Sequence, residues 1–306
     1  MKIYILGSLA FDEIGQYHGH FDALFRTEHL KNLSVSFVVE DTARFFGGCA
    51  GNVAYSLGLL DVPANLCGLL GDDGHFYKEA LEDCKMDTTN VFLMPGHTAH
   101  VMIATDLDGK QIAQFAPGVI GKNAPYFKLP KEAEAGDILF VAPENHDRMI
   151  QAVEQGSKMG LRVFFDPGQM IHTFSKKEVL GLLNLSEGVF ANDYEWGLLK
   201  EVSGLSDKQI FSKLKLVFIT HGADGVSFYV DEKENFVESV SAVQVDPTGA
   251  GDAFRAGVLA GFYKGLAIKS AVQIGTILGA SSVEYPKTQG HHLTEDQLLV
   301  IKNLGF

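Results

Sequence analysis

Short apolar runs alternate with longer segments of helical periodicity along most of this chain, and no other feature limits the fold as strongly. Runs such as Ile138–Val141 lack the polar alternation of a half-exposed strand. Strands of this kind are buried on both faces, as in a parallel sheet covered by helices on each side. The sequence therefore predicts an α/β fold with a mostly parallel central sheet. The expected strands are Ile3–Gly7, Ala64–Leu70, Ile138–Val141, Val163–Phe165, Gly188–Ala191, Val217–Thr220 and Val226–Val230, and the expected helices are Ala50–Leu60, His75–Cys84, His146–Lys158, Tyr194–Lys200, Asp207–Lys213, Asp252–Lys264, Ile268–Val283 and Thr294–Lys302.

Two segments break this alternation, about residues 13–46 and 97–117. They carry β-branched and aromatic residues in alternation, as in Val35–Val39 and Val101–Thr105, with a turn at Asp106–Gly109. We expect them to form a small antiparallel β-flap inserted into a single α/β domain of residues 1–306. The flap is either a lid that closes over a substrate and excludes water or an ordinary surface hairpin, and periodicity does not separate the two.

Charge and cysteine usage limit the partners. The formal net charge of −13 argues against a nucleic-acid surface or an anionic membrane. The cysteines, Cys49, Cys67 and Cys84, lack metal-ligand spacing and indicate reduced thiols. No apolar run has transmembrane length, and the N-terminal run is too short for a signal peptide. We expect a cytoplasmic protein that binds small molecules.

One glycine-rich turn, Asp246–Phe254, runs directly into a predicted helix. Gly249 and Gly251 permit backbone angles closed to other residues. Unpaired N–H groups at the positive end of a helix form a site for an anion, most often a phosphate. Asp252 in the same turn suits a carboxylate that accepts a proton from a hydroxyl attacking phosphorus. The alternative is a first-turn acid that only complements the helix dipole.

A second glycine cluster, Phe46–Asn52, opens another predicted helix. Its glycines let a ligand approach the backbone closely, and an outward-facing Asn52 is able to hydrogen-bond the vicinal hydroxyls of a sugar. Asp12 follows the first strand, and open α/β sheets bind ligands at the carboxyl ends of their strands. Taken singly, each has a structural alternative, a helix-packing Asn and a capping Asp.

Two further strand ends carry polar or glycine-rich sequence. Asn192–Glu195 follows the strand at Gly188–Ala191 and suits ligands that hold the waters of a magnesium ion, although the same residues read equally as a helix cap. Thr220–Gly225 ends the next strand and offers backbone donors for a nucleotide phosphate or ribose.

Together these motifs resemble the ribokinase (PfkB-type carbohydrate kinase) family, and the resemblance covers nearly the full chain. Their order and separation are far more specific than any single motif. The motifs that carry the resemblance are Gly47–Asn52, Gly68–Gly74, Asn192–Glu195, Thr220–Gly225 and Asp246–Phe254.

The resemblance implies a ribokinase-like fold and transfer of the γ-phosphate of ATP to a primary hydroxyl of a sugar or nucleoside. Asp252 would be the general base, and the amides of Gly249, Ala250 and Gly251 would form the anion hole. The other implied residues are Asp12, Gly47, Gly48 and Asn52 for the sugar hydroxyls; Asn192 and Glu195 for Mg²⁺ through water; Asn192, Glu195, Thr220, Gly222 and Gly225 for ATP; and Asp246 and Thr248 for a possible monovalent cation such as K⁺.

Within the family the chain looks most like the bacterial adenosine and broad nucleoside kinases. An apolar, aromatic flap suits a flat purine base, since base–aromatic stacking contributes roughly 1–3 kcal/mol per base. The residues expected to contact the base are Phe37, Met102, Phe115 and Gln169. Their alternative role is to fill the flap's own small core. The rival functions are a kinase for a free sugar such as fructose or ribose and a ligand-binding or regulatory protein that has kept the scaffold but lost the chemistry.

Two residues depart from the family pattern. Pro247 stands where many relatives have Thr or Ala, and it removes one N–H from the loop before the expected base. Arg255 stands where many relatives have a small or apolar residue. Three residues beyond Asp252, it shares a helical face with that residue, so it is expected either to touch a phosphate of ATP, to pair with the base, or to form a surface ion pair. The oligomer is expected to be a monomer or a homodimer formed through the flap.

Overall fold

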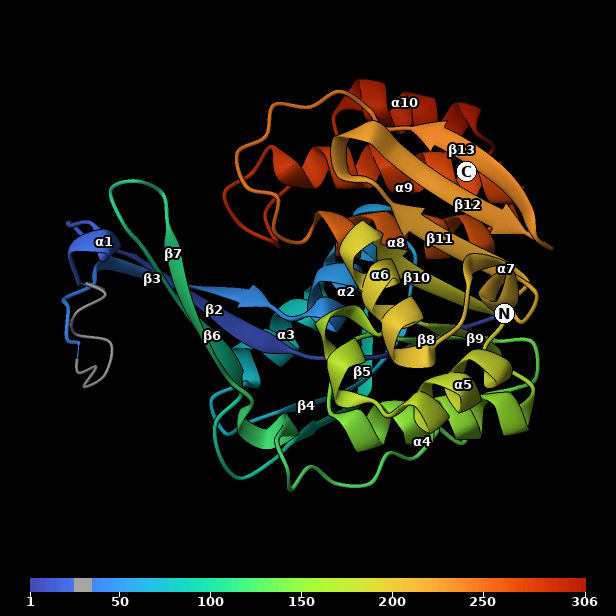
Figure 1. Ribbon diagram of the computed structural model, residues 1–306, viewed down its shortest axis with the longest axis horizontal. Coiled ribbons are helices and arrows are strands. Elements are labelled where there is room, and N and C mark those ends of the chain that lie inside the picture. Colours follow the sequence, from blue (N-terminus) through green and yellow to red (C-terminus); the bar gives the residue numbers. More distant parts are fainter. Residues whose placement is uncertain (25–34) are drawn as a thin grey trace.

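The computed structural model describes residues 1–24 and 35–306, and in these residues the strands form one sheet of nine and one of four (Figure 1). The larger sheet has the order β13-β12-β11-β10-β9-β8-β1-β4-β5. Its pairings are parallel from β5 to β11, and β12 and β13 add an antiparallel edge. The strands are β1 Ile3–Leu6, β4 Asn65–Leu70, β5 Asp87–Leu93, β8 Ile138–Val141, β9 Arg162–Phe165, β10 Gly188–Asn192, β11 Leu216–Thr220, β12 Gly225–Val230 and β13 Lys233–Glu238.

Helices cover both faces of this sheet, as its apolar strands predict (Figure 1). Side chains of β1 alternate between two apolar cores, with Ile3 and Ile5 in one and Tyr4 and Leu6 in the other. The Ile3 side packs against α2 Cys49–Leu59, α3 His75–Asp83, α8 Ala250–Tyr263, α9 Ile268–Val283 and α10 Glu295–Asn303. The Tyr4 side packs against α4 His146–Met159, α5 Lys176–Leu185, α6 Asp193–Ser203 and α7 Asp207–Phe211.

Helix α8 lies deep in the molecule, and residues 253–262 are all buried. Its close neighbour is α9, and glycines allow the approach. A Cβ placed on Gly257 would come within 2.5 Å of the Cα of Gly275, a distance that backbone atoms do not tolerate. The tight packing of α8 against α9 fixes the position of the turn before α8.

The smaller sheet projects from the body and has the order β3-β2-β6-β7 (Figure 1). Its strands are β2 Ala10–Gln16, β3 Glu40–Gly47, β6 Ala99–Thr105 and β7 Gln111–Ala116. The expected hairpin around Asp106–Gly109 is present as β6 and β7, which pair antiparallel. The sheet is not wholly antiparallel, because β2 and β6 run parallel. We call this sheet the lid.

Several boundaries differ from expectation. Val35–Val39 has no regular structure, and the strand lies at β3 instead. Part of the expected lid segment 13–46, residues 25–34, lies outside the described residues. The elements that were not expected include α1 Phe21–Leu24, α5, β5 and β13. In the described part of the chain no helix is both long and apolar enough to cross a membrane.

Candidate active site

A cavity of about 910 Å³ lies where the carboxyl ends of the central strands meet the lid and the start of α8. This volume is typical of small-molecule sites. Five strands of the large sheet each contribute one lining residue, at the strand's last position or within two residues after it. These residues are Ser8, Pro143, Asp166, Asn192 and Thr220. Sixteen of the twenty residues expected from sequence also line it: Asp12, Gly48, Asn52, Phe115, Gln169, Asn192, Glu195, Thr220, Gly222, Gly225, Thr248, Gly249, Ala250, Gly251, Asp252 and Arg255.

The turn before α8 presents backbone N–H groups to the cavity. Gly249 has a left-handed φ of 83°, which a residue with a side chain rarely adopts, and it is the N-cap of α8. No side chain caps this helix end. The Asp246 carboxylate accepts a 2.9 Å hydrogen bond from the Thr248 N–H and so stabilises the turn. Among the first amides, that of Ala250 donates a 3.3 Å hydrogen bond to the Pro247 carbonyl, so an anion would compete with Pro247 for it and would meet the amides of Gly249 and Gly251 directly.

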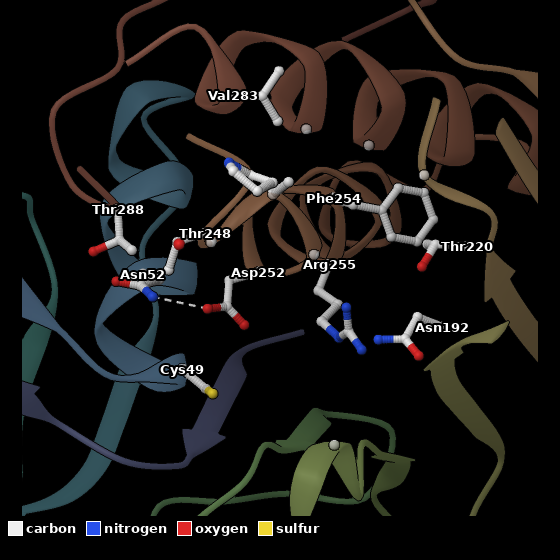
Figure 2. A pocket seen from close by; sticks show the side chains of 18 of the residues that line it. Cys49, Asn52, Asn192, Thr220, Thr248, Asp252, Phe254, Arg255, Val283 and Thr288 are labelled. Carbon is white, nitrogen blue, oxygen red and sulfur yellow. Dashed lines mark hydrogen bonds between the residues drawn. The ribbon is translucent and has the colours of Figure 1, made fainter. Parts of the chain in front are cut away.

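Asp252 lies in the first turn of α8, half-buried, and its carboxylate faces Asn52 of α2 (Figure 2). The Asn52 Nδ2 donates a 2.8 Å hydrogen bond to Asp252 Oδ2. Burial raises the pKa of Asp252 to about 6, while the nearby Arg255 charge and the Asn52 hydrogen bond oppose the rise. The carboxylate is thus ionised near neutral pH with a basicity close to that of a histidine.

Asp12 stands on β2, at the lid side of the same cavity. Its carboxylate packs against Gly47 so closely that a Cβ there would collide with it. Burial raises the pKa of Asp12 to about 6, and the negative charge of Asp252 adds to the rise, whereas a hydrogen bond with Thr288 lowers it. Asp12 and Asp252 are therefore two acidic groups of similar strength in one cavity.

Arg255 forms a buried ion pair with Asp166, which follows β9. Its Nη2 donates a 3.2 Å hydrogen bond to Asp166 Oδ1 and lies 3.7 Å from Glu195 Oε2. Burial raises the pKa of Asp166, and the charge of Arg255 opposes the rise. The expectation of a surface ion pair is wrong, because Arg255 is 6% exposed. Nor does its guanidinium pair with Asp252; its partners are Asp166 and Glu195.

Asn192 and Glu195 form a capping box at the start of α6, the structural alternative considered from sequence. Asn192 Oδ1 accepts from the Glu195 N–H and Glu195 Oε2 accepts from the Asn192 N–H, each at 2.8 Å. Both residues still line the cavity. Figure 2 shows Asn192 on the far side of Arg255 from Asp252. Thr220 is the register partner of Asn192 on the neighbouring strand β11.

Four of the expected residues lie outside the cavity lining. Phe37 packs against the rings of Tyr17 and Phe21, at 5.1 and 5.5 Å between centroids, so it belongs to the lid's own small core. Met102 points to the other face of β6 and is 49% exposed, because side chains alternate along a strand. Val101 and Ile103 line the cavity in its place.

The other two are Gly47 and Asp246. Gly47 lies behind Asp12, and its carbonyl accepts a 2.6 Å hydrogen bond from Tyr77. Asp246 accepts the hydrogen bond from the Thr248 N–H described above. Both support residues of the lining without being part of it.

The sequence reasoning missed a loop after α9, residues 284–294, that reaches back to the cavity. Thr288 lines the cavity, and Gln289 hydrogen-bonds Asn52 and Tyr77. Neither belongs to a motif with an intrinsic chemical signature, and both come from a stretch distant in sequence from their partners. The Asp166 to Arg255 pair was missed for the same reason.

Comparison with known proteins gives consistent matches over the whole chain. A family model described as pfkB family carbohydrate kinase matches residues 17–295. A nucleoside kinase from Methanocaldococcus jannaschii is 24% identical over 286 residues, covering 92% of this chain and 93% of that protein. The structure of Burkholderia thailandensis nucleoside kinase in complex with inosine matches with a TM-score of 0.85 at 30% identity, covering 99% of this chain and 98% of its own. A ribokinase from Cryptococcus neoformans var. grubii, solved with ADP, shares the fold with a TM-score of 0.77 at 17% identity over 99% of both chains.

Proposed function

The chain belongs to the pfkB family of carbohydrate kinases, and from this premise we propose that it transfers the γ-phosphoryl group of ATP to the 5′-hydroxyl of a purine nucleoside, adenosine or a close relative. The family and its ribokinase-like α/β fold agree with the expectation from sequence. Its members are phosphotransferases that act on hydroxyl groups, so the chain is a kinase for a nucleoside or a sugar.

One observation carries the proposal. A single continuous cavity joins Asp12, the α8 turn with Asp252, and the Thr220–Gly225 strand end. An acceptor bound by Asp12 and a nucleotide bound near Thr220 would therefore meet at Asp252.

The acceptor end of the cavity favours a nucleoside. The lid contributes Val101, Ile103 and Phe115, an apolar and partly aromatic surface, and Gln169 offers an amide to a base edge. A free hexose or pentose has hydroxyls around its ring and gains little from such a surface. The similar Burkholderia kinase was solved with inosine, which supports the same class of acceptor here.

In the proposed mechanism the chain's residues position the reactants and neutralise charge, as is general for phosphoryl transfer. Asp12 and Asn52 hold the ribose hydroxyls. Asp252 accepts the proton of the 5′-hydroxyl as the hydroxyl oxygen attacks the γ-phosphorus, while the bond from this phosphorus to the β–γ bridging oxygen breaks and ADP leaves with that electron pair. The N–H groups of Gly249, Ala250 and Gly251 donate to the transferred phosphoryl group, and the helix dipole of α8 adds to the stabilisation.

Magnesium fits the donor set at the nucleotide end. Asp166, Glu195 and Asp252 place three carboxylates around the one guanidinium of Arg255. This surplus of negative charge would repel a triphosphate unless a cation accompanies it. We propose that Mg²⁺ is held through water by Asn192 and Glu195 and that, when bound, it neutralises charge on the phosphates of ATP.

The test is phosphoryl transfer from ATP to adenosine, inosine, ribose and fructose under one set of conditions, with Mg²⁺ and with a chelator. We expect 5′-monophosphates of the nucleosides, a kcat/KM at least about tenfold above that of either free sugar, and no product without the metal. Assays in K⁺ and in Na⁺ test the monovalent cation proposed beside Asp246 and Thr248. A preference for ribose or fructose would replace the nucleoside proposal by its rival, and no transfer to any acceptor would refute both.

A further inference from the structure

Gln289 lies outside every motif that carries the family resemblance. Its side chain hydrogen-bonds two residues beside the cavity, Asn52 and Tyr77. It lies in the loop after α9, half-buried, with its Nε2 at 3.1 Å from Asn52 Oδ1 and 2.7 Å from the Tyr77 hydroxyl. Asn52 is 6% exposed and Tyr77 is fully buried. The three side chains thus form a hydrogen-bonded group in which Asn52 and Tyr77 are shielded from solvent.

The direction of every hydrogen bond in this group is fixed by its ends. Tyr77 donates at 2.6 Å to the carbonyl of Gly47, which is only able to accept. Its oxygen is therefore the acceptor for Gln289, and Gln289 turns its NH₂ toward both partners. Asn52 then presents Oδ1 to Gln289 and Nδ2 to the carboxylate of Asp252.

We propose that Gln289 is a positioning residue that fixes the orientation of the Asn52 amide, so that Asn52 donates to Asp252. This inference rests on the proposed role of Asp252 as general base. A flipped Asn52 amide would set its oxygen against the carboxylate and favour the protonated acid, which is unable to accept a proton.

Gly51 makes room for the group. A Cβ on Gly51 would collide with the Tyr77 hydroxyl and come within 3.0 Å of Gln289 Nε2. Gly51 lies in the first turn of α2 and therefore has a role separate from ligand contact. It admits the side chains that orient Asn52, its neighbour in the chain.

The decisive variant is Gln289→Glu, which keeps the shape and reverses the hydrogen bonding. A carboxylate at this position only accepts, so Asn52 is expected to turn its Nδ2 toward it and its Oδ1 toward Asp252. The other charged or titratable groups around Asp252 stay unchanged: Arg255 on α8, Glu195 on α6, Asp166 after β9, Asp12 on β2, Tyr77 on α3 and Cys49 on α2.

The first readout does not depend on activity. The carboxyl titration of Asp252 is followed by ¹³C-aspartate NMR in the full-length protein, with Asp252→Asn to assign the resonance. In Gln289→Glu we expect the pKa of Asp252 to rise by about one pH unit. In an Asn52→Ala background we expect the same substitution to raise it by less than half as much. An equal shift in both backgrounds would mean that the new charge acts directly on Asp252, and it would overturn the proposal, as would no shift at all.

The second readout is the pH profile of kcat. A one-unit rise predicts a kcat about fivefold lower at pH 6 that returns to within about twofold of wild type at pH 8.5, with the KM for ATP unchanged. Gln289→Met is the matched control, because it removes both donors without reversing them and leaves Asn52 free to donate. If Gln289→Met moves the acid limb as far as Gln289→Glu, or if Gln289→Glu lowers kcat equally at every pH, the reversal of hydrogen bonding is not the cause. Failure of the wild-type protein to phosphorylate any acceptor would refute the proposed function, whereas the NMR titration decides the role of Gln289 separately.

Discussion

Asp252 experiences opposing influences that together set its pKa between that of an exposed aspartate and neutrality. Burial in the cavity raises it to about 6, and the Arg255 charge and the Asn52 hydrogen bond limit the rise. A carboxylate with this pKa is stronger as a base than an exposed aspartate and is still ionised at pH 7. Burial of the ionised carboxylate also lowers the stability of the folded protein. Replacing Asp252 is therefore expected to lower the rate and to raise the stability.

Asp252→Asn is expected to abolish turnover while leaving binding nearly intact. The amide keeps the size of the side chain and accepts the Asn52 hydrogen bond but is unable to accept a proton. A general base contributes roughly 10²- to 10⁴-fold, so kcat should fall by that factor. Steady-state kinetics and calorimetric titration with nucleoside and with ATP measure the two quantities. A kcat within a few-fold of wild type would remove Asp252 from the role of base.

The same substitution is expected to stabilise the folded protein at alkaline pH. Because the folded pKa of Asp252 is about 6 and the unfolded value lies near 3.8, the folded state binds this proton more tightly. Ionising Asp252 therefore lowers stability above pH 6, on the order of 1–3 kcal/mol for a half-buried group, and the penalty disappears as pH falls toward 4. Thermal unfolding of wild type and Asp252→Asn at pH 8 and at pH 4.5 measures it. A Tm difference that does not shrink with pH would contradict this account.

Arg255 is expected to matter for stability before it matters for ATP. Arg255→Met leaves Asp166 buried without its partner, a change that typically costs 3–5 kcal/mol. Arg162→Met is the matched control, since Arg162 pairs with Glu187 at 2.8 Å but its side chain is 31% exposed. Denaturant unfolding should show a loss several times larger for Arg255→Met. Equal losses would mean that the Asp166 pair contributes no more than an exposed one.

At the residue scale the sequence predicts those groups that lie in motifs at strand or helix ends. Asp252 and Asn52 were found this way because a glycine turn before an apolar helix indicates a helix start. Gln289 and the Asp166 to Arg255 pair were not, because their roles depend on contacts across 237 and 89 positions of the chain. Without the fold, nothing local distinguishes them from loop or surface residues.

At the scale of elements, strand β6 shows why Val101 and Ile103 line the cavity and the expected Met102 does not. A strand presents successive residues to opposite faces, and without a known partner the sequence does not say which face is inward. The register of β6 with β2 pairs Val101 with Asp12 and Ile103 with Ile14, so these residues share the face of Asp12 and Met102 lies on the other.

Substitutions along β6 are expected to affect nucleoside binding in alternation. Val101→Ser and Ile103→Ser remove apolar surface from the cavity and should each raise the KM for nucleoside by about 5- to 30-fold, which corresponds to roughly 1–2 kcal/mol. Met102→Ser, on the opposite face of the same strand, should leave KM within twofold. Steady-state kinetics with adenosine at saturating ATP measures all three. Equal effects at the three positions would mean that the lid acts only through its stability.

Other elements were missed for physical reasons that differ from case to case. Val35–Val39 has the composition of a strand but lacks regular structure, because the strand that pairs with β2 is β3, eight positions of mostly exposed residues. Edge strand β13 is largely polar and exposed, so it has no apolar signal. Helix α5 begins with a capping box formed by Ser175 and Glu178, a local signal that was available in the sequence.

At the scale of the whole molecule, the parallel sheet was predictable because its strands are buried on both faces and therefore apolar throughout. The same regularity places the ends of successive strands along one edge, where the cavity lies. What the sequence did not predict is how the lid meets this edge, since that depends on the parallel pairing of β2 with β6 across a long separation.

The pH dependence of catalysis is expected to report both acidic groups of the cavity. Asp12 and Asp252 each have a pKa of about 6 in the free protein, and both are proposed to act ionised. The logarithm of kcat/KM for nucleoside should therefore fall below pH 6 with a slope approaching about 2. Asp12→Asn should reduce the limiting slope to about 1. A wild-type slope of 1 would mean that only one of the two carboxylates must be ionised.

The lid is joined to the body at four places, after β1, before α2, after β5 and after β7. The lid residues proposed to contact the base, Val101, Ile103 and Phe115, stand on one face of the lid, while the groups proposed to move the proton and the phosphoryl group stand on α8 and the turn before it. Exchange of that face therefore offers a route to new acceptors for protein engineers, with the reaction machinery left as it is.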